Sequence, residues 1–247
     1  YDIFTDRTFV ANSYVDADRA YIIPVNSFLY VDGYMNVPIT VTVKKSNGWS
    51  DVAAGLELVS ENAQEAVFKS TDFDSFLDSP LLMGNLKKLP DFEVNGINHR
   101  FWGYKMGEFD EGKLVKDLQS AIKVASGIID HIPYNEYTFI GIGPGRGGIE
   151  HLNSSTVSFN GDQLQSPQGY LGMINFLSHE YFHHYNVKRI RPFELGPFDY
   201  QNGSKTTQLW ISEGLTSYYA RIMVRRAGIS SESDFLKGVA SGITQFE

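Results

Sequence analysis

A helical run of apolar residues extends from Ser166 to Pro192. Apolar side chains occur on all sides of a helix drawn through this run, at Leu171, Met173, Ile174, Phe176, Leu177, Phe182 and Tyr185. Ser166 is a favourable N-cap and Pro167 suits the first helical position, so we expect the helix to begin there. Because a helix that is apolar on every side is usually buried, we predict that this helix lies in the core.

A second helix is indicated from about residue 206 to Arg226. Its apolar positions are Leu209, Trp210, Leu215, Tyr219, Ile222 and Met223. The arginines at its end complement the helix dipole, and Gly228 is suited to end it, because glycine readily adopts a left-handed conformation. The apolar residues around Glu213 predict that this acid is buried. The alternative is an ordinary solvated acid on a helix.

Residues 1–105 follow mainly the two-residue alternation of β-strands. The strand-like segments are residues 20–23, 27–31, 37–43, 56–59, 65–68, 92–94 and 97–104. The last two flank Asn95-Gly96, a favourable hairpin turn, and residues 72–77 suggest a helical turn. We predict a mainly β first domain with the character of a sandwich. The chain opens on Tyr1 without an initiator methionine, so we expect this domain to be incomplete at its start.

The pattern changes near Asp110. Apolar residues recur at helical spacing from Leu114 to Ile129, which predicts an amphipathic helix over residues 111–131. A strand at residues 136–142, a loop rich in glycine and proline through Gly148 and a short strand at residues 156–159 come next. Strands beside helices predict an α+β second domain over residues 106–247.

The first helix carries His179-Glu180-Tyr181-Phe182-His183 in its middle. His179 and His183 are one turn apart on one face, and Glu180 lies beside the first. Buried imidazoles and carboxylates are costly unless something pairs with them. A divalent metal held by the two histidines, with Glu180 as a base for water, meets this need and is the H-E-x-x-H arrangement of zinc peptidases. The alternative is a chance spacing of two histidines.

Glu213 is the candidate third ligand. Two histidines, one glutamate and an open position form a known coordination set for a catalytic zinc ion, so we predict one Zn²⁺ per chain. The proposed chemistry is attack of water on a peptide carbonyl, with Glu180 accepting the proton and later passing it to the leaving amine.

The two segments with these residues resemble one known family. His179 to Pro192 reads HEYFHHYNVKRIRP, and Leu209 to Tyr219 reads LWISEGLTSYY. Both closely resemble the glycyl aminopeptidase family of zinc metallopeptidases, which are gluzincins distantly related to aminopeptidase N. Residues 12–33 and 79–84 fit the amino-terminal region of the same family.

This resemblance implies a thermolysin-like catalytic domain after the β domain, and removal of small N-terminal residues such as glycine. Residues 147–151 resemble the segment that holds the free α-amine of the substrate, which makes Glu150 the candidate amine anchor. Gly147 and Gly148 would let a substrate backbone approach closely. The family's transition-state tyrosine and its frequent PDZ module are expected beyond residue 247, so we expect the catalytic domain to be truncated. Tyr218 shares the helix of Glu213 and is too close in sequence to serve.

Other polar residues near the motif receive more modest interpretations. His151 is expected to be a surface or hydrogen-bonding histidine, and His184 a surface residue or a support for the ligands. The basic run that begins at Lys188 is expected to complement the helix dipole. Related enzymes often support a ligand histidine with an acid one turn after the ligand glutamate. Here that position is Ser217, so we expect the support to come from elsewhere.

Composition narrows the function further. The 247 residues carry a net charge of −8, which argues against nucleic acid as the main partner. No apolar run reaches the roughly 18 residues of a membrane span. The absence of cysteine excludes thiol catalysis and Cys-bound zinc. The expected partners are peptides with a free N-terminus; a zinc endopeptidase and a non-catalytic, zinc-containing peptide-binding protein remain as alternatives.

Overall fold

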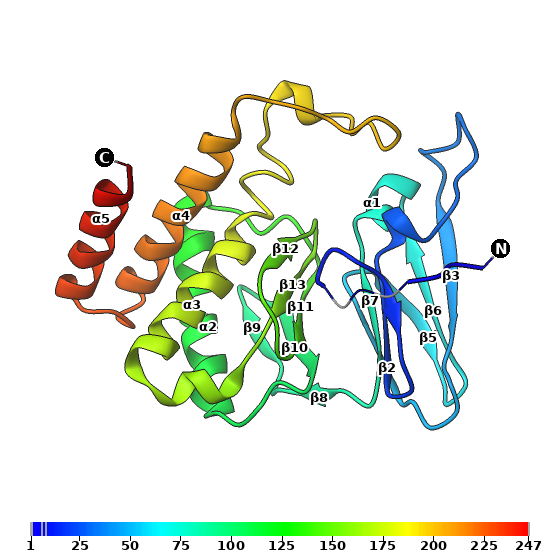
Figure 1. Cartoon of the computed structure of the whole chain (residues 1–247), viewed down its shortest axis with the longest axis horizontal. Coiled ribbons are helices and arrows are strands. Elements are labelled where there is room, and N and C mark those ends of the chain that lie inside the picture. Colours follow the sequence, from blue (N-terminus) through cyan, green and yellow to red (C-terminus); the bar gives the residue numbers. More distant parts are fainter. Residues whose placement is uncertain (1, 6, 8, 247) are drawn as a thin grey trace.

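The computed structural model describes residues 2–5, 7 and 9–246, arranged as three sheets and five α-helices within those residues (Figure 1). The strands are β1 (Tyr14–Val15), β2 (Arg19–Ile22), β3 (Ile39–Lys44), β4 (Asp51–Ala54), β5 (Glu57–Glu61), β6 (Glu65–Ser70), β7 (Leu81–Gly84), β8 (Lys87–Lys88), β9 (Phe92–Val94), β10 (Ile97–Tyr104), β11 (Glu136–Ile142), β12 (Gly148–Glu150) and β13 (Ser154–Ser158). The helices are α1 (Phe73–Leu77), α2 (Glu111–Ile129), α3 (Pro167–Phe182), α4 (Leu209–Arg226) and α5 (Glu232–Phe246). Short 3-10 helices lie at Pro24–Asn26, Gly161–Gln165 and Phe193–Leu195.

Two antiparallel sheets form a sandwich from the first part of the chain. One has the order β1-β2-β7-β4 and the other the order β3-β6-β5. Their facing sides share one apolar core, which includes Ala54 and Met83 from the first sheet and Val41 and Phe68 from the second. The sandwich character predicted for this region is confirmed.

The four-stranded sheet is the middle layer of the molecule (Figure 1). Successive side chains of a strand point to opposite faces, so Leu81 and Met83 of β7 face the sandwich core while Leu82 faces the other way. Leu82 packs with Ile140 and Ile142 of β11. Both faces of this sheet are therefore covered, which explains why β4 and β7 are buried along their whole length.

The third sheet supports the helices. Its order is β12-β13-β11-β10-β8, with β9 also paired to β10. β10, β11 and β13 are parallel, whereas β12 runs antiparallel to β13 at the edge. Phe101 and Phe139 face α2, α3 and α4 in the largest apolar core. The mixed sheet with helices on one face confirms the predicted α+β class.

Several predicted elements match the structure closely. The strand predicted at residues 136–142 is β11, and the hairpin over Asn95-Gly96 joins β9 to β10. The amphipathic helix is α2, which begins after Asp110 and ends where Asp130 adopts a left-handed conformation. The end of α4 before Gly228, at φ +75°, also agrees.

Three local predictions differ from the structure. Residues 27–31 form no strand, because Phe28 turns inward onto Phe76 while Leu29 and Val31 are exposed and pair with no neighbour. β12 begins at Gly148, in the segment predicted to be a loop, and β7 lies where no strand is predicted. α3 ends at Phe182, so the two histidines lie at its C-terminal end rather than in its middle.

The division of the chain between residues 105 and 106 stays a prediction, and its outer limits, residues 1 and 247, lie outside the described residues. β10 precedes that division, yet it pairs along its whole length with β11. This pairing favours a boundary before β8.

No helix in the described part of the chain has the length and apolar character needed to cross a membrane.

Candidate metal centre

The C-terminal end of α3 brings two histidine side chains together. The Nε2 atoms of His179 and His183 lie 2.9 Å apart. His179 is in the last turn of the helix, and His183 is its C-cap, where the chain leaves the helix. The two rings therefore present one nitrogen each to the same point in space.

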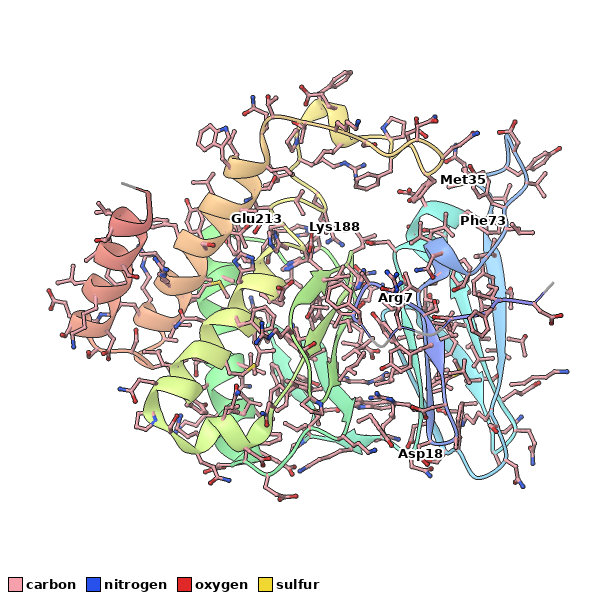
Figure 2. The ribbon with its side chains drawn as sticks, in the orientation of Figure 1. Arg7, Asp18, Met35, Phe73, Lys188 and Glu213 are labelled. Carbon is pink, nitrogen blue, oxygen red and sulfur yellow. The ribbon has the colours of Figure 1, made fainter. Side chains whose placement is uncertain are left out.

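Glu213 reaches this point from α4 (Figure 2). Its Oε2 atom lies 3.4 Å from Nε2 of His179 and 3.7 Å from Nε2 of His183. The three ligand atoms all lie within 4.8 Å of one another. Among the described residues this is the one group of three or more such side chains that could hold a metal ion; the assignment of the three as ligands stays a prediction.

The expected burial of Glu213 is wrong, since its side chain is 61% exposed. Its neighbours Trp210 and Leu215 are exposed too. α4 instead buries Ser212 and Thr216 beside Glu213, while Ala220, Val224 and, as predicted, Met223 are buried further along. The apolar pattern is therefore wrong in the first half of the helix, near Glu213. An exposed third ligand is still compatible with a catalytic metal, which needs an open position.

The second nitrogen of each histidine also has a partner. Nδ1 of His183 lies 2.8 Å from the carbonyl oxygen of Asn186. A carbonyl only accepts, so Nδ1 carries the hydrogen and Nε2 of the neutral ring keeps its lone pair. Nδ1 of His179 lies 3.3 Å from Oγ of Ser217. Contrary to our expectation, Ser217 itself supports this ring, at the position where related enzymes carry an acid.

The charges at the site are coupled. The neighbouring imidazoles of His179 and His183 hold the pKa of Glu213 well below its ordinary value. Burial alone would lower the pKa of His183, but Glu213 and Glu150 outweigh it and the pKa is raised. Two converging imidazole nitrogens and a carboxylate oxygen form a donor set that suits Zn²⁺. The residues therefore fit the metal that the sequence predicts.

Glu180 is buried beside this group. Only 5% of its surface is exposed, and its Oε2 atom has no hydrogen-bond partner. Burial, assisted by the charge of Glu150, raises its pKa to about 8. A Cβ atom at Gly148 would lie 2.6 Å from the carboxyl carbon of Glu180, so the absence of a side chain there makes room for this carboxylate.

The predicted amine-binding segment lies at the sheet edge. Gly148 and Glu150 belong to β12, and Glu150 is partly exposed. Its carboxylate makes no hydrogen bond or ion pair with the described residues, but it acts electrostatically on both Glu180 and His183. Gly147 has φ +86°, which favours glycine, and borders Phe9. The structure thus brings Glu150 and Gly148 to the candidate site, while their binding roles stay predictions.

The two other histidines near the motif, His151 and His184, contact residues outside the candidate ligand set. His151 is buried, with Nδ1 3.2 Å from Oδ1 of Asp78. His184 is neither exposed nor beside the ligands: it is fully buried and packs against Tyr181 and Tyr185. Burial holds its pKa well below the ordinary value.

The basic run after His183 does not complement a helix dipole, because α3 has already ended. Lys188 instead forms an ion pair with Asp78 at 2.7 Å. Arg189 donates to the carbonyl oxygens of Pro133, Leu152 and His184 and to the side chain of Asn153.

Sequence reasoning missed two residues that shape the site. The side-chain amide of Asn186 lies within hydrogen-bonding distance of the carbonyl oxygens of Ile211 and Ser212 and of Oγ1 of Thr216. The two residues are Asn186, three positions after His183, and Thr216, three positions after Glu213. That spacing was the one available signal in the sequence. Together they join the end of α3 to α4.

Two cavities, of about 960 and 320 Å³, lie elsewhere. The larger is lined by ends of β3, β5 and β6 and by residues such as Arg100 and Glu136, and the smaller by α1 and residues such as Lys188. Neither is lined by the three candidate ligands.

The sequence matches two models of one family. Residues 172–247 match the M61 glycyl aminopeptidase, and residues 1–85 match the Peptidase M61 N-terminal domain. The two matches together cover more than half of the chain and include the motif on α3 and Glu213. A comparison with curated protein sequences found no match.

Solved structures resemble the chain, among them the following two. The aminopeptidase N family protein from Idiomarina loihiensis is 26% identical, with a TM-score of 0.85, over 91% of this chain and 40% of its own. The Legionella pneumophila aminopeptidase A, solved in complex with aspartic acid, is 14% identical with a TM-score of 0.61, over 87% of this chain and 26% of its own. The second likeness concerns the fold alone. The chain therefore spans 40% or less of the length of these two proteins.

Proposed function

This chain belongs to the M61 glycyl aminopeptidase family, and from that premise we propose that it supplies the metal centre of a zinc-dependent aminopeptidase that removes small N-terminal residues such as glycine. The observation that carries the proposal is the convergence of His179, His183 and Glu213 beside Glu180 and the unpaired Glu150.

His179, His183 and Glu213 would hold one Zn²⁺ per chain. The chemistry that a bound zinc supplies is polarisation of the scissile carbonyl and acidification of water. The hydrogen bond from Nδ1 of His183 to the carbonyl oxygen of Asn186 supports this role, because it orients the ring with its Nε2 lone pair toward the other ligands. Ser217 orients His179 from α4.

Glu180 is the proposed general base. Its buried carboxylate has an oxygen without a partner, which can accept a proton from the attacking water and return it to the leaving amine. Without a metal its pKa is about 8 because of burial and of Glu150. A divalent cation held by the neighbouring ligands would lower that pKa and favour the carboxylate form, which a base requires.

Glu150 is the proposed anchor for the substrate. An α-amine is cationic or nearly so at neutral pH, and an unpaired carboxylate binds it through a charge-assisted hydrogen bond. Glu150 ends the edge strand β12, close enough to Glu180 to raise its pKa. Holding the amine there would fix the scissile bond one residue from the substrate's N-terminus.

Peptides with free and with acetylated N-termini test this function in the whole protein. We expect cleavage of free-amine peptides and little cleavage of acetylated ones. Glu150→Ala should raise KM for free-amine peptides by an amount that corresponds to about 1.5–3 kcal/mol, with zinc content unchanged. Elemental analysis before the assay establishes the zinc content.

Each alternative has its own outcome in this experiment. Equal cleavage of free and acetylated peptides would refute the anchor and favour a zinc endopeptidase. Zinc with peptide binding but no turnover would favour a non-catalytic peptide-binding protein. The absence of metal in freshly purified, unchelated protein would refute the metal centre itself.

A further inference from the structure

Asp78 is contributed by the N-terminal sandwich, yet its carboxylate contacts the catalytic part of the chain. It follows α1 directly and is its C-cap. Its Oδ2 atom accepts the backbone N–H of Leu152 at 2.8 Å, and Oδ1 lies 3.2 Å from Nδ1 of His151. Lys188 donates to the same Oδ1 atom at 2.7 Å. His151 and Leu152 directly follow the candidate amine anchor Glu150, and Lys188 follows the candidate ligand His183 by five residues.

The first two partners form the turn between β12 and β13. Glu150 is the last residue of β12, and His151 and Leu152 follow it at once. On the other side of the turn, Arg189 donates to the carbonyl oxygen of Leu152 at 2.8 Å and to the side chain of Asn153 at 2.9 Å. The turn is thus held between Asp78 and Arg189.

The third partner connects the turn to the metal ligands. Lys188 and Arg189 follow His183 in the segment that leaves α3 (Figure 2). The chain that holds one ligand therefore also holds the turn after Glu150. Because the side chains of Lys188 and Asp78 are only 12% and 22% exposed, their ion pair is well shielded from solvent.

This contact matters because β12 is a short edge strand, which in the described part of the chain pairs only with β13. The turn after it is also closed by a backbone hydrogen bond from His151 to Ser154 and held by Arg189, and Asp78 adds to these supports from the side of the sandwich. A group that is misplaced by about 1 Å can reduce the rate of an enzyme by about 100-fold. The position of the Glu150 carboxylate therefore depends on what fixes the turn that follows it.

We propose that Asp78 is a positioning residue for the aminopeptidase reaction, which fixes the turn at His151 and Leu152 and so holds Glu150 where it can bind the substrate's α-amine. This inference rests on the proposed function, because it assigns Asp78 an action through Glu150. It adds a residue from the sandwich to the machinery that recognises the substrate.

A double-mutant cycle in the whole protein tests the coupling. Asp78→Asn should raise KM for free-amine peptides by about tenfold, with zinc content unchanged. In the Glu150→Ala background the same substitution should change KM by less than about twofold, since its effect passes through Glu150. Equal effects in both backgrounds, or an unchanged KM in the folded variant, would overturn the inference.

Asp51→Asn is a matched control. Asp51 also accepts a backbone N–H, from Leu86 at 3.0 Å, and pairs with a lysine, Lys88, at 2.5 Å, but it lies in the sandwich away from β12. This variant should leave KM unchanged. A rise in KM equal to that of Asp78→Asn would show a general structural effect and overturn the inference.

Hydrogen exchange tests the contact without enzyme activity, and a second variant serves if Asp78→Asn does not fold. In metal-free protein, Asp78→Asn should speed hydrogen exchange at the Leu152 amide, whereas Asp51→Asn should not. If Asp78→Asn does not fold, His151→Phe, which removes one of the contacts and keeps a ring, should raise KM in the same direction; an unchanged KM there overturns the inference.

If Glu150→Ala itself leaves KM unchanged, the anchor in the proposed function has failed. An additive cycle with an effective Glu150→Ala means that Asp78 alone has failed.

Discussion

The absence of a side chain at residue 148 determines where the carboxylate of Glu180 can lie. A Cβ atom there would be 2.6 Å from both the carboxyl carbon and Oε1 of Glu180, closer than such contacts occur. Those atoms, and a ring carbon of Phe176 that would lie 2.8 Å away, belong to the ends of side chains, so they can shift while the backbone of β12 stays in place. The close approach therefore affects the position of the candidate base rather than the folding of β12.

We expect Gly148→Ala to reduce peptide hydrolysis strongly while zinc content stays unchanged. The displaced carboxylate would lose its alignment with water, and general-base catalysis contributes about 10²–10⁴-fold, so the loss should approach that of Glu180→Gln. Steady-state kinetics measures the loss of peptide hydrolysis, and urea unfolding measures the change in the free energy of unfolding. Gly172→Ala is the control on α3, where no atom lies within 4 Å of the added Cβ, and it should leave activity unchanged. Normal activity of Gly148→Ala would disprove this account of Glu180.

At the scale of elements, the metal centre depends on how α4 docks against the end of α3. Asn186 makes this connection. Its side-chain amide donates to the carbonyl oxygens of Ile211 and Ser212 on α4, while its backbone carbonyl accepts from Nδ1 of His183. The buried stripe of α4 is small and polar near Glu213, so hydrogen bonds rather than apolar contacts determine the alignment there.

Asn186→Ala keeps the backbone carbonyl that accepts from His183, but it removes the side-chain hydrogen bonds that hold α4, the helix of Glu213. It should therefore weaken zinc binding by about 10–100-fold, the usual effect of losing the support of a metal ligand. It should also lower the free energy of unfolding by about 1–3 kcal/mol, because buried carbonyls lose their donor. Competition with a chelator and denaturant unfolding measure these effects. Asn175→Ala is the comparison, since the amide of Asn175 donates only within α3, to the carbonyl oxygen of Leu171. Equal zinc affinity in both variants would contradict the role of Asn186.

At the scale of the whole molecule, the sandwich and the catalytic part form one continuous structure. The sheet that contains β7 has the sandwich core on one face and β11 on the other. Polar contacts reinforce this packing: Asp78 pairs with Lys188, and Tyr200 donates to Asp74 of α1. A change in the sandwich can therefore alter the geometry of the candidate metal centre.

The Asp78–Lys188 pair predicts how stability depends on pH. Burial raises the pKa of Asp78, but Lys188 and His151 outweigh it, and the pKa lies below its ordinary value of 3.8. The unfolded chain then binds more protons than the folded one, so this contribution is complete above about pH 4 and is lost as the pH falls through the folded-state pKa. In metal-free protein we expect Asp78→Asn to lower the free energy of unfolding by about 3 kcal/mol at pH 7.

The difference between wild type and this variant should shrink as the pH falls below about 4. Urea unfolding at a series of pH values from 7 to 3 measures it. A difference that stays constant over this range would show that the charge of Asp78 does not stabilise the fold.

The sequence by itself determined most elements whose pattern is local. The spacing of His179 and His183, the α+β order and β11 could all be read from it, because helical and strand periods act over a few residues. The family resemblance also identified Glu213, Glu150 and Gly148 as candidates. Local rules alone misjudged residues 27–31 and the start of β12 and left β7 unassigned, because strand pairing depends on partners elsewhere in the chain.

Only the tertiary structure decided which faces of the helices are buried and which distant residues meet. The apolar pattern placed Glu213 inside, but near this residue α4 turns Ser212 and Thr216 inward and leaves Trp210 exposed. The support of His179 by Ser217, the room that Gly148 leaves for Glu180 and the link from Asp78 to Leu152 join segments that are far apart in sequence. No local period records such contacts, since they arise only when the sheets and helices pack.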